Sequence, residues 1–217
     1  MTIRRLVDIS STSTSVTSPV RIGVLALQGD VREHAAILTA LGAEAIPVRR
    51  PEQLDGLDGL VIPGGESSVI DKLSRIFGVR DPLRALIADG LPVYGTCAGL
   101  ILLADEIEGA IDGQLTFGGL DVTVARNAFG GQVESFETTL DVDGIDEPVD
   151  ATFIRAPLIT RVGPGASAIA ALPDGGVVAV QQGNLLGTSF HPEMNGETRL
   201  HARFLELVEA RRAVAAA

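Results

Sequence analysis

The sequence predicts an α/β protein with three layers, in which a mostly parallel central sheet is flanked by helices and the C-terminal half is mixed or antiparallel. Two observations indicate this. Short apolar segments alternate with helix-like segments over the first half of the chain, which is the pattern of parallel strands joined by crossover helices. From about residue 117, strand-like segments follow one another with few helices between them. With 217 residues, 46% of them hydrophobic, we expect one domain with a substantial core.

The N-terminal half divides into alternating elements. Residues 1–19 carry a Ser/Thr run without an apolar face, and we expect a disordered leader there, with an edge strand as the alternative. The predicted domain covers residues 20–217. Asp30 and Glu33 have the spacing of a capping box at a helix start. The predicted strands, which are short apolar runs bounded by turn residues, are 22–27, 43–48, 59–63 and 91–95. The predicted helices are 30–42, 81–88 and 98–107.

The C-terminal half is predicted to be richer in strands. The expected strands are 119–125, 136–142, 151–154, 167–172, 177–182 and 185–190. A final helix is expected over 197–213, where Leu200, Phe204, Leu207 and Val208 form one apolar stripe. Ligands of open α/β sheets bind at the carboxyl ends of the strands, so we expect the functional residues to lie there.

Composition excludes several classes of function. A formal net charge of −11 disfavours nucleic-acid binding. One cysteine and three scattered histidines cannot form a zinc cage. Without tryptophan and with one tyrosine, the chain lacks an aromatic platform for bases or sugars. No apolar run has the length of a membrane span, and no signal-like segment opens the chain. We expect a cytoplasmic protein that needs no metal or cofactor.

The single cysteine, Cys97, lies between Gly95 and Gly99 where a predicted strand meets a predicted helix. A nucleophile flanked by glycines at such a turn is typical of a nucleophile elbow. The backbone is strained there, and side chains at the flanking positions would collide with neighbouring strands. The N-terminus of the following helix would stabilise a thiolate. We therefore expect Cys97 to be a nucleophile rather than a small buried hydrophobic residue.

A cysteine that attacks an acyl group needs a base, and the base needs a carboxylate to orient it. His191 and Glu193 supply both at the end of a predicted strand. Pro192 fixes the backbone between them, and side chains two residues apart on an extended chain point to the same side. The other histidines, His34 and His201, stand on helical stretches with charged neighbours, and we expect both to face solvent.

Acyl transfer also needs donors for the developing oxyanion. The backbone N–H of Ala98, next to the candidate nucleophile, is one candidate donor. The glycine-rich segment 63–68 follows a predicted strand and would supply the second; a plain turn is the alternative. No Gly-Lys-Ser/Thr follows, so this is no phosphate-binding P-loop. Segment 163–168 matches a loose dinucleotide pattern, but it opens no recognisable helix and is interpreted as a turn.

Together these motifs resemble the class I, or triad, glutamine amidotransferases, and more narrowly the glutaminase subunit of pyridoxal 5′-phosphate synthase. The Cys and His-Pro-Glu motifs mark the superfamily, whereas the Arg-Asn and Ile-Arg-Ala-Pro segments are specific to the narrower family. The resemblance extends from residue 22 to 193 and into the last helix. The matching segments are 25–29 with 31–34, 63–67, 95–100, 126–127 with 129–130, 153–157 and 189–193.

The resemblance implies hydrolysis of L-glutamine to glutamate and ammonia. Cys97 would attack the side-chain amide and form a glutamyl thioester. His191 would protonate the leaving ammonia and then activate water, with Glu193 orienting it. The residues carried over as substrate-binding are Gly65, Glu66, Ser67, Arg126, Ile154 and Arg155, of which Gly65 would share the oxyanion hole with Ala98. The two arginines fit either the substrate carboxylate or a role as loop anchors.

The resemblance also implies a partner. Ammonia would pass to a separate synthase (lyase) subunit, which builds the vitamin B6 cofactor from a pentose phosphate and a triose phosphate, in a ring of synthase subunits decorated by glutaminases. The region from Gln28 to His34 would lie near that contact. A flexible Gly64–Gly65 peptide, misaligned in the free protein and reoriented by docking, would explain activation by the partner.

Three alternatives differ in partner or class. The same enzyme could supply ammonia to another amination, such as histidine or nucleotide synthesis, which a synthase pull-down would decide. A cysteine peptidase or chaperone-like relative on a similar fold would not be labelled at Cys97 by a glutamine analogue. A non-catalytic scaffold for the synthase would show no glutaminase activity.

Overall fold

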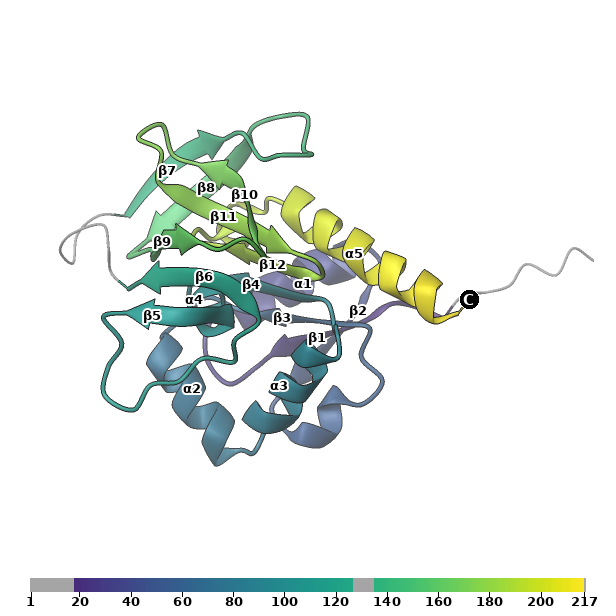
Figure 1. Ribbon diagram of the computed structural model, residues 1–217. Helices are drawn as coiled ribbons and strands as arrows, with labels where there is room; N and C mark the ends of the chain where they lie inside the picture. The colour runs from purple at the N-terminus through teal and green to yellow at the C-terminus, as the bar shows by residue number, and fades with distance from the viewer. Residues whose placement is uncertain (1–17, 127–134, 217) are drawn as a thin grey trace, which may run out of the picture.

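The structure, a computed structural model, describes residues 18–126 and 135–216 (Figure 1). The leader predicted at 1–19 lies outside the described residues apart from its last two, as do Asn127, Phe129 and Gly130 of the family-specific segment. The helices are α1 (Val31–Ala40), α2 (Ser67–Ile76), α3 (Arg80–Ala88), α4 (Ala98–Leu103) and α5 (Arg199–Ala215), with two 3₁₀ turns, η1 (Pro51–Leu54) and η2 (Pro192–Asn195).

Strands make up most of the remaining described chain. Those of the first half are β1 (Arg21–Leu25), β2 (Glu44–Val48), β3 (Gly59–Ile62), β4 (Val93–Thr96), β5 (Ala104–Glu108) and β6 (Leu120–Ala125). Those of the second half are β7 (Ser135–Leu140), β8 (Val149–Ile154), β9 (Leu158–Val162), β10 (Ser167–Ala171), β11 (Val177–Gln182) and β12 (Leu185–Thr188).

The predicted architecture is confirmed. Among the described residues, one large sheet has the order β2-β1-β3-β4-β12-β11-β9-β6-β5, with β10 paired to β11. The strands from β2 to β12 in this order are parallel. Antiparallel pairing takes over from β12 through β11 and β9 to β6, and β7 and β8 form a separate antiparallel pair. At the far edge β5 and β6 pair in parallel, so the sheet is parallel from β2 to β12 and mixed beyond β12.

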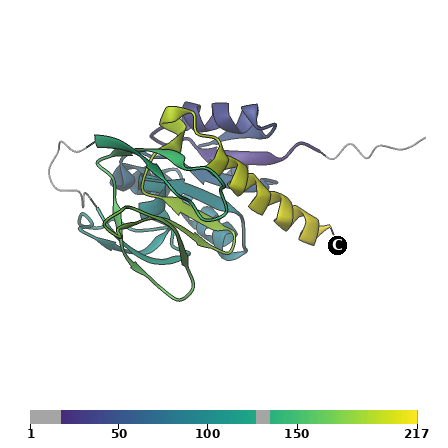
Figure 2. The same cartoon turned by 90° about the horizontal axis from the view of Figure 1, so that it is seen from above.

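Two cores cover the two faces of the sheet. One contains apolar side chains of α2, α3 and α4, and the other contains those of α1 and α5. Figure 1 shows α2 and α3 on the side opposite α5, and Figure 2 shows α5 from above as it runs along the sheet. Because side chains alternate along a strand, Leu60 and Ile62 of β3 enter the first core while Val61 enters the second. Of the predicted stripe of α5, Leu200, Phe204 and Val208 are buried in the second core, whereas Leu207 is only partly buried.

The parallel part of the sheet determines where the site forms. Strands β1, β3, β4 and β12 are neighbours that run in the same direction. Their carboxyl ends therefore lie at one edge. The segments that follow them contain Asp30, Gly65, Cys97 and His191, so residues more than 150 positions apart in sequence meet there.

The sequence prediction is wrong for three elements, one of which is strand β9, which it missed. The helix expected over 98–107 ends at Leu103, and Ala104–Glu108 forms strand β5 in parallel pairing with β6. Helix α2 was not predicted, because its N-terminal residues were interpreted only as part of a glycine-rich loop. Within the described residues, no helix has both the length and the apolar character needed to cross a bilayer.

Candidate active site

The turn at Cys97 has the geometry of a nucleophile elbow. Cys97 directly follows β4 and precedes α4, and its φ of +47° is a conformation that L-residues rarely adopt. A Cβ added at Gly95 would lie 2.5 Å from the carbonyl carbon of Gly99, and one at Gly99 would overlap the carbonyl oxygen of Ile62. Backbone contacts therefore require glycine on both sides of Cys97. The structure thus gives the physical reason for the glycines that the motif predicted.

His191 and Glu193 meet as expected, although the local backbone differs from the prediction. Glu193 lies in the 3₁₀ turn η2, so the chain between the two residues is not extended. The turn still brings Glu193 Oε1 to 2.9 Å from His191 Nδ1. The backbone N–H of His191 donates to the carbonyl of Thr152 at 2.8 Å, which fixes the start of the turn. Pro192 suits the first position of such a turn, since it has no N–H to satisfy.

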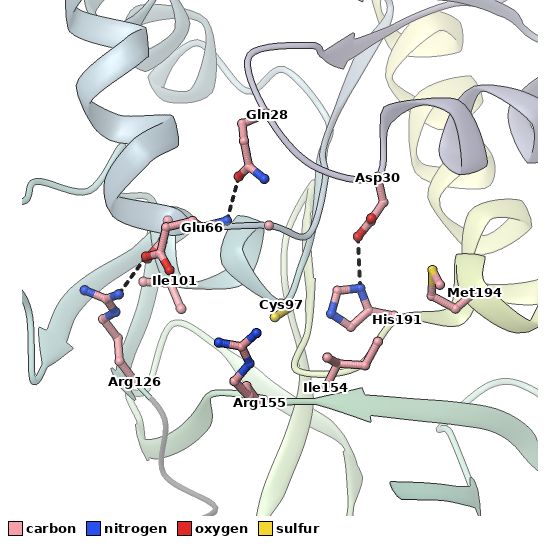
Figure 3. Close-up of a pocket in the computed structure, with 12 residues that line it drawn as sticks. Gln28, Asp30, Glu66, Cys97, Ile101, Arg126, Ile154, Arg155, His191 and Met194 are labelled. Carbon is pink, nitrogen blue, oxygen red and sulfur yellow. Dashed lines mark hydrogen bonds and ion pairs between the residues drawn. The ribbon is translucent and has the colours of Figure 1, made fainter. Parts of the chain in front are cut away.

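A second carboxylate reaches the same imidazole nitrogen. Asp30 Oδ2 lies 3.3 Å from His191 Nδ1, and Figure 3 shows the ring between Asp30 and Cys97. The predicted capping box is not formed, because the Asp30 side chain makes no capping hydrogen bond with α1. Its carboxylate therefore faces the site. The sequence signal for this role was the position of Asp30 after the first parallel strand, beside the other site segments.

The surroundings of His191 favour its protonated form. Burial acts to lower the pKa of His191, but hydrogen bonds with Asp30, Cys97 and Glu193 outweigh it and raise that pKa to about 12. Burial acts to raise the pKa of Glu193, and this is outweighed by His34 and His191, which hold that pKa well below its ordinary value. An imidazolium beside a thiolate and a carboxylate is the charge state that cysteine-dependent acyl transfer requires.

The expectation that His34 and His201 face solvent is wrong. Both are fully buried, one on α1 and the other on α5. His34 Nδ1 lies 2.8 Å from His201 Nε2, and His34 Nε2 lies 3.1 Å from Thr96 Oγ1. The same Nε2 is 3.4 Å from Glu193 Oε1. Charged residues next to them in sequence occupy other faces of the two helices, so sequence neighbours gave a misleading signal.

A cavity of about 350 Å³ opens above Cys97 and His191. Six further residues that the sequence predicted as substrate-binding line it, namely Gly65, Glu66, Ser67, Arg126, Ile154 and Arg155. Glu193 and Ala98 do not line it, because the first lies behind the imidazole and the second is buried at the start of α4. Four lining residues were not predicted, namely Gln28, Asp30, Ile101 and Met194.

One wall of the cavity is joined by polar contacts around Glu66. Arg126 Nη2 donates to Glu66 Oε1 at 2.8 Å, and Arg126 Nη1 donates to Gln114 Oε1 at 2.7 Å. Gln114 Nε2 in turn donates to Ser67 Oγ at 3.0 Å. The backbone N–H of Glu66 donates to Gln28 Oε1 at 2.6 Å (Figure 3). Of the two roles left open for Arg126, the structure shows a loop anchor.

The opposite wall comes from the end of β8. Ile154 is the last residue of that strand, and Arg155 follows it with a φ of +44°. This unusual backbone conformation turns the chain at the cavity, and Figure 3 shows the Arg155 guanidinium on the Cys97 side. A guanidinium placed beside the nucleophile can receive a substrate carboxylate.

The glycine-rich segment is held in one orientation. The backbone N–H of Asp30 donates to the carbonyl of Gly64 at 3.2 Å. Gly65 has a φ of +149°, and a Cβ there would overlap Gln28 Oε1. Both glycines therefore allow close contact with the segment after β1.

Asp30, His191 and Glu193 place three potential metal-ligand atoms within 4.8 Å of one another. Both carboxylates already face the same imidazole nitrogen. The arrangement therefore serves to orient and charge the imidazole, and no metal is needed to explain it.

Fold and site together define a candidate cysteine-dependent acyl-transfer enzyme on an α/β scaffold. The model of the SNO glutamine amidotransferase family matches residues 24–210, and the chain belongs to that family. A pyridoxal 5′-phosphate synthase subunit PdxT from Clavibacter michiganensis subsp. michiganensis is 64% identical over 87% of this chain and 90% of its own length. The PdxT of Leifsonia xyli subsp. xyli is 62% identical over 88% of this chain and 97% of its own length. A solved glutamine amidotransferase shares 49% identity, with a TM-score of 0.82 over 87% of this chain and 98% of that one.

Proposed function

We propose that the chain is the glutaminase subunit of a pyridoxal 5′-phosphate synthase, which hydrolyses L-glutamine and delivers ammonia to a synthase subunit. The observation that carries the proposal is the convergence of Cys97, His191 and Glu193 at one cavity, in a chain that is 64% identical to a pyridoxal 5′-phosphate synthase subunit. The family membership narrows the acyl group to the side-chain amide of glutamine.

The first half-reaction releases ammonia. The thiolate of Cys97 adds to the carboxamide carbon of glutamine, and the carbonyl electron pair moves to oxygen. When this intermediate collapses, the C–N bond breaks and the proton of the His191 imidazolium passes to the leaving nitrogen. The products are ammonia and a glutamyl thioester on Cys97. Glu193 stabilises the imidazolium and fixes its ring orientation.

The second half-reaction regenerates the enzyme. Neutral His191 takes a proton from water, whose oxygen adds to the thioester carbon. The C–S bond then breaks, which restores the Cys97 thiolate with the His191 imidazolium beside it. The product leaves as glutamate, and the proton of its new carboxyl group passes to solvent. The backbone N–H groups of Ala98 and Gly65 are proposed as donors to the oxyanion of both steps.

The substrate is proposed to lie along the cavity floor. Arg155 would bind the α-carboxylate in bidentate geometry, and Glu66 would face the α-ammonium group. Arg126 would act through Glu66, because it already pairs with that carboxylate. Ser67 and Ile154 complete the two walls.

A synthase subunit is the proposed partner, in a ring of synthase subunits with glutaminases bound outside. The segment from Gln28 to His34 is proposed to lie near the contact. Its backbone already holds the Gly64 carbonyl through Asp30. A partner that shifts this segment would reorient the Gly64–Gly65 peptide and so align the oxyanion donors. We also propose the cytoplasm as its compartment, since a reducing environment keeps the catalytic thiol free.

Glutamate release from L-glutamine tests this proposal, with and without the cognate synthase subunit. Activity that rises at least tenfold with the partner, and that is absent in Cys97→Ala, is the expected result. Equal activity with and without the partner would overturn the docking-dependent alignment. No activity in either state would overturn the assignment and favour the scaffold alternative.

A further inference from the structure

Buried side chains continue the line of hydrogen bonds behind the candidate triad. His34 Nε2 lies 3.4 Å from Glu193 Oε1 and 3.1 Å from Thr96 Oγ1, and His34 Nδ1 lies 2.8 Å from His201 Nε2. His34, His201 and Thr96 are all fully buried, and the Glu193 side chain is too. The described mechanism does not use His34, although it contacts both the triad carboxylate and the residue before the nucleophile.

The neighbours of His34 determine where its proton lies. Burial and the neighbouring His34 lower the pKa of His201 to about 3, so His201 is neutral and carries one ring proton. The two rings are in hydrogen-bond contact, so one proton lies between them. A carboxylate can only accept, and therefore Nε2 of His34 must carry a proton to face Glu193 favourably. In the arrangement that suits both neighbours, His34 donates at Nε2 toward Glu193 and accepts at Nδ1 from His201 Nε2–H.

Glu193 depends on this donor. Its Oε2 has no hydrogen-bond partner among the residues that the structure describes. Oε1 has contacts with His191 Nδ1 at 2.9 Å and His34 Nε2 at 3.4 Å. A buried carboxylate without enough donors is costly to keep ionised. Loss of His34 would leave Glu193 with His191 alone.

Resting on the proposed glutaminase function, we propose that His34 is a positioning residue for the reaction. It holds the Glu193 carboxylate toward His191 Nδ1, and its contact with Thr96 links α1 to the nucleophile elbow. His201 fixes the tautomer of His34 that makes this possible. The chain of contacts from the thiol therefore runs through His191 and Glu193 to His34 and ends at α5.

Several titratable groups surround Glu193. His34 and His191 stabilise the carboxylate, whereas burial opposes its ionisation. The groups are His34 on α1, His191 at the start of η2, His201 on α5, Asp30 before α1, Tyr94 on β4 and Glu197 before α5. A variant without the Nε2–H of His34 still has Glu193 buried and close to Asp30, so the Glu193 carboxylate becomes easier to protonate.

The test compares His34→Leu with His34→Gln in the complex with the synthase subunit. His34→Leu removes the donor, and we expect kcat for glutamine hydrolysis to fall about ten- to hundredfold with KM nearly unchanged. The acid limb of the kcat profile should move to higher pH, because Glu193 must be ionised to orient His191. In His34→Gln the amide N–H replaces Nε2–H, and both properties should return toward wild type.

One control variant and one additional measurement accompany the kinetic assays. Leu38→Ala removes a fully buried side chain one turn further along the same helix, so it matches a loss of helix packing without touching Glu193. It should lower thermal stability and leave the pH profile in place. The chain has three histidines, so imidazole NMR can follow His191 directly in the folded variants. In His34→Leu, His191 should lose its proton at a lower pH than in wild type.

The outcomes separate this inference from the proposed function. Wild-type complex without glutaminase activity would refute the proposed function. An active wild type together with an unchanged acid limb and an unchanged His191 titration in His34→Leu would overturn the positioning role. The positioning role would also be overturned if kcat in His34→Gln is as low as in His34→Leu, provided that thermal unfolding shows both variants to be folded.

Discussion

Gly64 gives a direct test of how tightly the site is built. It belongs to the glycine-rich segment after β3, and its α-carbon faces the imidazole of His191. A Cβ at Gly64 would overlap His191 Cε1 and lie 2.7 Å from Nδ1 and 2.9 Å from Asp30 Oδ2. Ordinary van der Waals contact begins near 3.4 Å. The Gly64→Ala substitution therefore forces the ring, or the loop, to move.

The displacement can be converted into an expected rate. The contact with Nδ1 falls short of van der Waals separation by about 0.7 Å, and the contact with Cε1 by more. A misplacement of about 1 Å at a reacting group costs on the order of a hundredfold in rate. We expect kcat/KM for glutamine hydrolysis by the Gly64→Ala complex to fall about a hundredfold, because Nδ1 moves away from both carboxylates.

The matched control is Gly42→Ala at the end of α1. Gly42 has a φ of +89°, and a Cβ there meets nothing within 4 Å. This variant should lose about 1 kcal/mol of stability from backbone strain and keep wild-type kcat/KM. Thermal unfolding and glutamate release are measured on both. A kcat/KM within threefold of wild type in folded Gly64→Ala would refute the tight placement of His191.

Three further predictions concern charge, substrate binding and packing. Glu193→Gln should be less thermally stable than wild type by its full amount at neutral pH, and the difference should shrink as pH falls below 4.5. The reason is that the pKa of Glu193 is lower in the folded than in the unfolded protein, so its ionised form stabilises the fold above the unfolded-state pKa and this stabilisation is lost as pH falls. A stability difference that does not change with pH would contradict this. Arg126→Met should raise KM for glutamine about tenfold and keep kcat within threefold of wild type, because it releases Glu66 from a 2.8 Å ion pair. An unchanged KM would contradict a role of Glu66 in substrate binding. Phe204→Ala should lower the free energy of unfolding, measured in urea, by about 3–5 kcal/mol, because the ring is fully buried beside Tyr94; a loss under 1 kcal/mol would show that the second core is loosely packed.

The parallel half of the fold was predictable because its central strands β3, β4 and β12 are buried on both faces. Such strands appear in the sequence as short continuous apolar runs, as at 59–62 and 93–96. The error at 98–107 arose because Leu102 and Leu103 lead without a break signal into Ala104 and Ile107. The chain leaves the helix there because β6 offers a partner for parallel pairing, and that partner lies beyond any local pattern.

The site was predictable where a residue's chemistry is tied to a local motif. Cys97 needs its two glycines, and the proximity of Glu193 to His191 follows from their two-residue separation whether the backbone is extended or a 3₁₀ turn. Contacts between distant elements were not predictable in the same way. The meeting of His34 with His201 depends on how α1 and α5 pack on one face of the sheet.

Asp30 shows a conflict between local and tertiary interactions. Its spacing to Glu33 indicates a capping box, but its side chain makes no such bond. The carboxylate lies near His191 instead, where it accepts from a protonated ring. A carboxylate paired with a charged ring gains a direct attraction between opposite charges, which a neutral backbone N–H at a helix start does not provide.

Labelling with an electrophilic glutamine analogue, a chloroketone, tests the central claim most directly. The thiolate of Cys97 would displace chloride and form a stable thioether, which peptide mass spectrometry locates. Cys97 is the single cysteine of the chain. We expect one adduct, on Cys97, which excess L-glutamine prevents and which forms more slowly in His191→Ala. An adduct elsewhere, or labelling that glutamine does not slow, would contradict a glutamine site at Cys97.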